Sequence, residues 1–157
     1  MSNPAPATPL ETQCREVRHG SPDYQRTLVL RQEVLRAPLG LALAEMDLAA
    51  ELGHLHFALF ADDDTLLACV IAVPLAPGHA KIRQMAVATV WQGHGLGRCL
   101  LLATERALAQ RGFQHLEMHA RVSALGFYAK LGYQVEGPEF IEVTLPHRRM
   151  TKALATA

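Results

Sequence analysis

The sequence predicts a mixed α/β fold, with a central mixed sheet of about seven strands and helices on both faces. Half of the 157 residues are hydrophobic, which suffices for one compact core. Strand-like and helix-like stretches follow in the order strand, two helices, three strands, helix, strand, helix and two strands. We expect a single domain over 11–154, preceded at 1–10 by a Pro- and Ala-rich disordered tail.

The first part of the chain contains a helix signal and a hairpin signal. Ser21-Pro22 is a typical helix start, and Asp62-Asp63-Asp64 is a typical turn between two strands. The second hairpin strand is almost continuously apolar, as expected for a central strand that is covered on both faces. The predicted elements are a strand at 13–17, a helix from Ser21 to Pro38, a weaker helix after Gly40, and strands at 54–60 and 66–73.

The second part contains the most regular helix. Apolar residues spaced by four, three and four define its buried face, while Arg98, Glu105 and Arg106 are expected on its outer face. The stretch 81–87 lacks clean alternation, which favours a bulge or a strand beside a site. The predicted elements are a strand at 81–87, a helix from Leu96 to Gly112, a strand at 114–120, a helix at 123–131, and two strands split by Gly137-Pro138.

The charge balance and the cysteines limit the function classes. The 15 basic and 15 acidic residues cancel, and we find no basic patch typical of nucleic-acid binding. No apolar stretch approaches the roughly 18 residues of a membrane helix. Cys14, Cys69 and Cys99 are far apart and odd in number, which fits a reducing cytoplasm. His54 and His56 share a strand face but lack a third ligand, so no metal is expected.

A glycine-rich loop, Gln92-Gly93-His94-Gly95-Leu96-Gly97, opens the regular helix. Main-chain N–H groups at a helix start lack intrahelical partners, and the helix dipole favours an anion there. A dinucleotide fingerprint would require Gly where Arg98 stands, and no Lys-Ser or Lys-Thr pair follows as in a P-loop. A pyrophosphate site and a loop without a ligand remain as alternatives.

Two spaced motifs resemble those of the GNAT acetyltransferase superfamily. Met85-Ala86-Val87 and the glycine-rich loop resemble its strand and Q/R-x-x-G-x-G/A acyl-CoA loop. Ala124-Leu125-Gly126-Phe127-Tyr128-Ala129-Lys130-Leu131-Gly132-Tyr133 resembles its A-x-x-F-Y-x-K-x-G-F/Y helix and strand. The resemblance covers roughly 52–152 and implies a GNAT-type sheet, with acetyl-CoA (coenzyme A) as co-substrate.

The resemblance also implies the cofactor-binding residues. The main chain of Met85, Ala86 and Val87 would contact the pantetheine arm. The pyrophosphate would lie against Gln92, Gly93, His94, Gly95, Leu96, Gly97 and Arg98. Arg98 either adds charge to the phosphates or is simply a solvated residue of the first helical turn.

Acetyl transfer to an amine requires a base for the ammonium and an acid for the departing thiolate. Tyr128 matches the superfamily's thiolate-protonating tyrosine, and a phenol with an ordinary pKa of about 10 is protonated at neutral pH. Without the resemblance, Tyr128 would be interpreted as a core aromatic.

The base is predicted from one strand face. Period-2 alternation places His115, Glu117, His119 and Arg121 together, and so polar a face favours a cleft. His119, near the carboxyl end, is the predicted base, with Glu142, which is also a predicted substrate contact, and a water chain as alternatives. In the competing interpretation His115 pairs with Glu117 on the surface and His119 is a structural histidine. The superfamily often carries Asn where this chain has Arg121, which would contact a substrate carboxylate or a phosphate, or pair with Glu117.

Together these features predict an acetyl-CoA-dependent N-acetyltransferase that acetylates an amine of a small molecule by direct transfer. The alternative is a non-catalytic acyl-CoA-binding or regulatory module of the same fold. We expect neither nucleic acid nor a membrane as partner. The acceptor amine, the acyl-chain preference and the oligomeric state remain open, with a homodimer among the alternatives.

Overall fold

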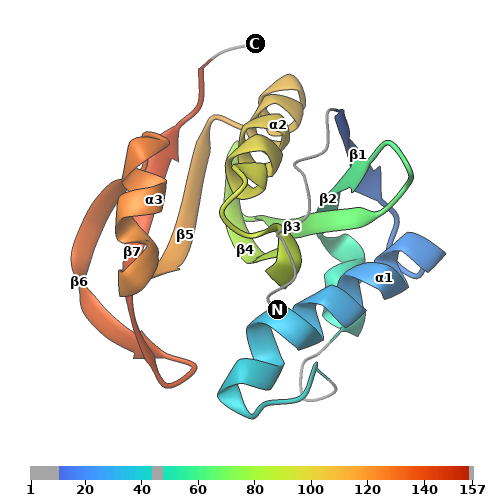
Figure 1. The fold of residues 1–157 in the computed structure, drawn as a ribbon. Coiled ribbons are helices and arrows are strands. Elements are labelled where there is room, and N and C mark those ends of the chain that lie inside the picture. The colour runs from blue at the N-terminus through green and yellow to red at the C-terminus, as the bar shows by residue number, and fades with distance from the viewer. Residues whose placement is uncertain (1–10, 44–47, 156–157) are drawn as a thin grey trace. The chain divides into compact units, whose positions relative to one another are not determined.

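A computed structural model describes residues 11–43 and 48–155, so the predicted tail at 1–10 lies outside the described residues (Figure 1). The helices are α1 Pro22–Arg31, α2 Leu96–Gln110 and α3 Leu125–Lys130. The strands are β1 Thr12–Val17, β2 Leu55–Ala61, β3 Leu66–Pro74, β4 His79–Val87, β5 His115–Arg121, β6 Gln134–Glu142 and β7 Leu145–Ala153.

The strands form one seven-stranded mixed sheet in the order β1-β2-β3-β4-β5-β7-β6. β4 and β5 are parallel, whereas β1 with β2 and β7 with both of its neighbours are antiparallel. The predicted fold class is therefore confirmed. Within the described ranges, no helix combines the length and the apolarity that crossing a bilayer would require.

Internal contacts divide the chain into two compact units. The first comprises the described residues up to Ile71 together with Gln84–Thr104, and the second comprises Ala72–Arg83 and the chain from Glu105 onward. The glycine-rich loop thus belongs to the first unit, whereas His119, Tyr128 and Glu142 belong to the second. The single domain over 11–154 stays a prediction.

Helix α1 begins as predicted. The Ser21 hydroxyl accepts a hydrogen bond from the Tyr24 N–H at 3.1 Å, and Pro22 occupies the first helical position, where its missing N–H costs nothing. The chain continues as a π-helical segment, Gln32–Arg36, and a short 3-10 turn that contains Pro38. The weaker helix predicted after Gly40 falls partly on residues 44–47, outside the described ranges. Between these residues and β2, the chain forms a 3-10 segment at Ala49–Gly53.

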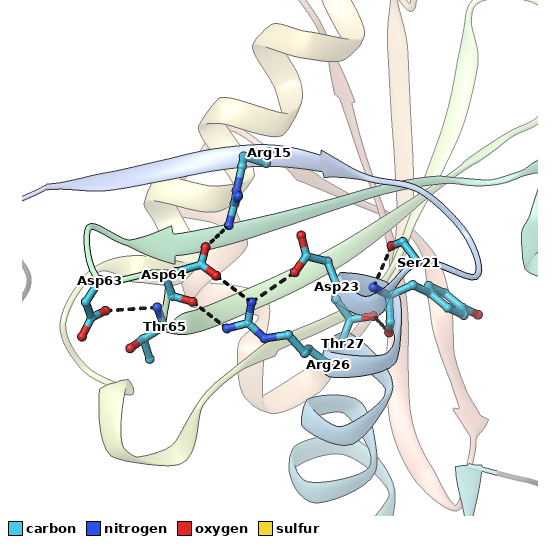
Figure 2. Close-up of polar contacts among 9 residues, drawn as sticks. Arg15, Ser21, Asp23, Arg26, Thr27, Asp63, Asp64 and Thr65 are labelled. Atoms are coloured by element: carbon cyan, nitrogen blue, oxygen red, sulfur yellow. Dashed lines mark hydrogen bonds and ion pairs between the residues drawn. The ribbon is translucent and has the colours of Figure 1, made fainter.

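The predicted turn between β2 and β3 is confirmed, and an ion-pair network ties it to β1 and α1 (Figure 2). Asp63 accepts a hydrogen bond from the Thr65 N–H at 3.0 Å, and Asp64 adopts a φ of +69°. Arg26 of α1 donates to the Asp64 carbonyl at 2.6 Å, and Arg15 of β1 pairs with the Asp64 carboxylate. Exposed pairs contribute little energy individually, so the network mainly fixes the turn's position against α1.

The core of the first unit lies between α1 and the strands. β3 is buried over almost its whole length, which confirms the prediction of a covered central strand. The buried cluster comprises Val17, Tyr24, Leu30, Ala58, Phe60, Cys69 and Ala86. It fixes α1 against β2 and β3 and includes a residue from the carboxyl end of β4.

The prediction that Glu105 lies on the outer face of α2 is wrong. Its side chain is only 8% exposed and accepts hydrogen bonds from the Tyr133 hydroxyl and the Lys152 ammonium, both at 2.7 Å. A buried carboxylate is tolerated because both partners satisfy it. The helical spacing could not identify these partners, since they lie 28 and 47 residues along the chain.

The predicted split at Gly137-Pro138 is also wrong. β6 runs through both residues, with a register shift between Glu136 and Phe140. β6 is an edge strand, where Pro138 interrupts no central ladder, and Gly137 adopts a φ of +81° that suits a bulge.

The turn between β6 and β7 lies at Val143 and Thr144, with φ values of +49° and +65°. Two successive positive φ values are typical of a type I′ hairpin turn, which usually carries Asn-Gly. The β-branched pair therefore gave no turn signal. Thr144 therefore lies in the turn, and Glu142 is the last residue of β6.

Candidate active site

The glycine-rich loop has a backbone that only glycine adopts easily. Gly93 and Gly95 have φ values of +82° and +76°, and a Cβ added at either would meet no atom within 4 Å. The Gly95 carbonyl accepts the first α2 hydrogen bond, from the Cys99 N–H at 3.1 Å. The preceding N–H groups, those of Leu96, Gly97 and Arg98, therefore lack intrahelical partners, as the anion-site prediction requires.

Two side chains of the glycine-rich loop stabilise its conformation by hydrogen bonds to nearby main-chain carbonyls. His94 Nδ1 lies 3.1 and 3.0 Å from the carbonyls of Trp91 and Gln92, so it carries a proton and donates. The Gln92 amide donates to the Val87 carbonyl at 3.0 Å. This bond occupies one lone pair of a main-chain group predicted to meet the pantetheine arm, and leaves the second lone pair for another donor.

Arg98 lies exposed in the first turn of α2, which contains no acidic residue. It forms no ion pair with the described residues. A cation in the first turn opposes the helix dipole unless an anion is bound nearby. This position therefore favours the phosphate alternative over that of a merely solvated residue.

The carboxyl end of β4 contains a strained residue that the sequence did not single out. Gln84 has a φ of +56°, and its Oε1 atom is buried without a hydrogen-bond partner among the described residues. Strain of this kind is frequent at functional sites. Met85 and Val87 beside it are half-buried and Ala86 is buried. The irregular alternation of 81–87 was the only sequence signal.

The predicted polar face of β5 is confirmed. Burial alternates along the strand: Leu116, Met118 and Ala120 are 1–3% exposed, and the residues between them are not buried. Since the pairing of β4 with β5 runs from His79 with His115 to Ile82 with Met118, Lys81 lies opposite Glu117, on this same face.

The structure joins the two predicted bases. His119 Nδ1 lies 3.0 Å from Glu142 Oε1 and 3.3 Å from Lys81 Nζ. The Phe140 ring packs edge-on against the imidazole, with centroids 4.9 Å apart, and His147 Nε2 lies 3.9 Å from Glu142 Oε2. His119 and Glu142 are thus direct partners, whereas the sequence treated them as alternatives.

The cluster around His119 favours an ionised carboxylate. Burial alone would raise the pKa of Glu142, but the hydrogen bond to His119 and the charges of His119, Lys81 and His147 lower it. Burial and the charge of Arg83 lower the pKa of Lys81. Sequence reasoning missed Lys81 and assigned no role to His147.

Glu117 belongs to a separate network. Arg149 donates to it at 3.2 Å and also pairs with Glu136, so the predicted alternative of an Arg121–Glu117 pair is not found. A cavity of about 630 Å³ lies beside these residues, lined also by His79 and His115, but not by His119. It therefore does not coincide with the acid–base cluster.

Tyr128 lies half-buried on α3, and its ring packs against Phe127 and Tyr133 with centroids 5.0 and 6.0 Å away. Burial raises its pKa and the charge of Arg121 opposes the shift, so the phenol is protonated at neutral pH. No described residue hydrogen-bonds its hydroxyl. Tyr128 is thus both a packed aromatic and an available proton donor.

Among residues 11–43 and 48–155, no group of three His, Cys, Asp or Glu side chains is placed to hold a metal ion.

The chain is similar in sequence to known proteins. A family model described as an acetyltransferase (GNAT) domain matches residues 36–154. The uncharacterized protein YyaT of Bacillus subtilis strain 168 is 34% identical over 79 residues, which are 50% of this chain and 53% of that protein. The chain thus spans about half the length of the curated relatives it matches.

Solved structures agree in fold. A Lactobacillus plantarum crystal structure, provisionally named an N-acetyltransferase, has a TM-score of 0.82 at 27% identity over 92% of this chain and 99% of its own. An aminoglycoside 6′-N-acetyltransferase crystallised with coenzyme A has a TM-score of 0.76 at 15% identity, over 92% and 98%, which shows the fold alone. The family match covers most of the chain and confirms the resemblance and the predicted enzyme class at the level of the domain: the chain belongs to the GNAT acetyltransferase family.

Proposed function

We propose that the protein transfers the acetyl group of acetyl-CoA directly to an amine of a small molecule. The observation that carries this proposal is the contact between His119 and the ionised Glu142 on the polar face of β5. A family member that only bound acyl-CoA would not need such a pair. The non-catalytic alternative has no comparable support.

Acetyl-CoA as co-substrate is supported by the glycine-rich loop. The positive φ values of Gly93 and Gly95 expose main-chain N–H groups at the start of α2, and Arg98 adds a cation without an ion-pair partner among the described residues. The structure of similar fold with bound coenzyme A is consistent with this assignment.

The proposed reaction balances with two protein groups. His119 takes a proton from the acceptor ammonium, and the neutral amine attacks the thioester carbonyl carbon. The new C–N bond forms and the C–S bond breaks, so the electron pair of that bond leaves with sulfur. Tyr128 protonates the thiolate, the nitrogen of the new amide returns its second proton to the Tyr128 phenolate through solvent, and the proton on His119 passes to solvent. The products are an N-acetyl amide, free coenzyme A and one proton.

Acetyl-CoA is expected to raise the melting temperature of the protein. A ligand that binds only the folded state stabilises it by about 2.7 kcal/mol at a hundredfold excess over Kd. Differential scanning fluorimetry with acetyl-CoA, with NADH as control, measures the shift. Absence of a shift at millimolar acetyl-CoA would contradict the cofactor assignment.

Turnover is tested by thiol release from acetyl-CoA with a panel of small amines. A rate that rises with one class of amine supports the enzyme and identifies its acceptor. Thermal stabilisation by acetyl-CoA without thiol release for any amine would instead favour the non-catalytic module.

Gly95→Val is expected to weaken coenzyme A binding at least tenfold, because the side chain would occupy the space in which a pyrophosphate meets the N–H groups. Gly95 has a φ of +76°, so valine also introduces backbone strain and is expected to lower the stability of the fold. Gly20→Val is the matched control, since Gly20 has a φ of +81° and equally open surroundings. Calorimetry should show binding lost in the first variant and kept in the second; equal Kd values would refute the loop's role.

A further inference from the structure

We infer that Glu142 is a positioning residue that fixes the tautomer of His119, with the proton on Nδ1 and the free lone pair on Nε2. This inference rests on the proposed role of His119 as the base. It assigns the proton-accepting atom and gives Glu142 a role other than that of an alternative base.

Two neighbours compete for the same ring nitrogen. Glu142 Oε1 lies 3.0 Å and Lys81 Nζ 3.3 Å from His119 Nδ1. An ionised carboxylate only accepts hydrogen bonds, so it requires a proton on Nδ1. An ammonium only donates, so it requires a lone pair there. A neutral imidazole cannot satisfy both, and the two neighbours specify opposite tautomers.

The carboxylate decides this competition. If Nδ1 kept its lone pair for Lys81, two acceptors would face each other at 3.0 Å, which is unfavourable while Glu142 is ionised. With the proton on Nδ1, the bond to Glu142 is charge-assisted and about twice as strong as a neutral one. Lys81 then acts through its charge, which helps to keep Glu142 ionised.

The surroundings hold this arrangement in place. The Phe140 ring packs edge-on against the imidazole at an interplanar angle of 75°, which fixes the ring orientation. His147 donates from Nδ1 to the Leu145 carbonyl at 2.8 Å and turns Nε2 toward Glu142. None of the described residues hydrogen-bonds Nε2 of His119, which leaves that atom available to a substrate.

Other charged groups face the pair from each neighbouring strand. Besides Lys81 on β4, they are Arg149, which pairs in register with His119 on β7, and Glu117 and Arg121 on β5 itself. Arg149 is already engaged by Glu117 and Glu136. Glu142 is therefore the only carboxylate in hydrogen-bond contact with His119 among the described residues.

Nitrogen-15 NMR of the imidazoles tests the tautomer independently of activity. The signal of His119, assigned by its loss in His119→Gln, is expected to show a protonated Nδ1 in the wild-type protein at a pH where the ring is neutral. A protonated Nε2 would overturn the inference. Lys81→Met is the control variant and should leave the tautomer unchanged. A protonated Nε2 in that variant would show that Lys81, and not Glu142, determines the tautomer.

Glu142→Gln keeps the shape of the side chain but removes the charge that selects the tautomer. We expect kcat/KM for the amine to fall at least tenfold, with coenzyme A affinity retained. The His119 signal of this variant, read in the same NMR experiment, is expected to lose its preference for a protonated Nδ1. An unchanged tautomer together with an unchanged kcat/KM would contradict the positioning role.

The assigned tautomer of His119 and the proposed acetyltransferase function can be refuted independently. A wild-type protein that shows the expected tautomer but releases no thiol with any amine would refute the proposed function and leave the assignment of the proton intact. An active wild-type protein with the proton on Nε2 would do the reverse. If Glu142→Gln does not fold, the wild-type and Lys81→Met spectra still decide the inference.

Discussion

Replacing Tyr128 with Phe is expected to lower kcat about a hundredfold or more, with little change in coenzyme A affinity. The substitution removes the hydroxyl that would protonate the thiolate and keeps the ring that packs against Phe127 and Tyr133. General acids typically contribute a hundredfold to ten-thousandfold. No described residue hydrogen-bonds this hydroxyl, so its loss leaves no unsatisfied partner among them. Steady-state kinetics and calorimetry measure the two quantities.

Tyr133→Phe is the matched control for this experiment. Its hydroxyl donates to the buried Glu105, so its loss should lower the stability of the fold rather than kcat. If Tyr128→Phe turned over like the wild-type protein, Tyr128 would be a core aromatic and water would supply the proton. A loss of kcat in Tyr133→Phe alone would likewise contradict the assignment.

Replacing Glu51 with Ala is expected to lower the free energy of unfolding by about 3–5 kcal/mol, the usual cost of breaking a buried ion pair. Arg31 is 1% exposed and Glu51 5%. The guanidinium donates to both carboxylate oxygens, at 2.8 and 2.7 Å, and the Tyr24 hydroxyl donates at 2.7 Å. Removing the carboxylate leaves a buried cation uncompensated. Urea denaturation followed by circular dichroism measures the loss.

The double variant Arg31→Met with Glu51→Leu separates the ion pair from the packing. Removing both charges should restore much of the stability, because a well-packed apolar pair often replaces a buried ion pair at little cost. If Glu51→Ala alone were as stable as the wild-type protein, the pair would contribute nothing. Equal losses in the single and double variants would attribute the effect to packing.

The same pair makes stability depend on acid pH. Burial alone would raise the pKa of Glu51, but hydrogen bonds from Arg31 and Tyr24 and the charge of Arg31 lower it. A carboxyl group whose folded-state pKa is depressed stabilises the fold above its unfolded pKa, and that contribution is lost as the pH falls through the folded value. Denaturation midpoints of the wild-type protein should therefore fall more steeply below about pH 4 than those of Glu51→Gln.

Local chemistry made part of the site predictable. The glycine-rich loop was recognisable because the glycines and the cation that favour an anion site at a helix start are close together in the sequence, from Gly93 to Arg98. The polar face of β5 followed from period-2 alternation, which burial confirms. Tyr128 required the family resemblance, since spacing alone favoured a core aromatic.

The contact between His119 and Glu142 was beyond sequence reasoning. It depends on how β6 and β7 are paired, and the turn that sets this pairing is made by Val143 and Thr144, which carry no turn signal. The Gly137-Pro138 signal is real, but it marks a bulge within an edge strand. Lys81 was missed for a similar reason, because its partner lies 38 residues away on another strand.

The bulge in β6 has a consequence for how this family member can vary in length. Glu136 pairs with Arg149 and Phe140 with His147, so the residues 137–139 lie opposite Arg148 alone. Two extra residues preserve the alternation of the strand, which keeps Phe140 and Glu142 on the face of His119. Losing or gaining one residue here would turn the carboxylate to the opposite face, so related chains that keep the pair should differ at this point in steps of two.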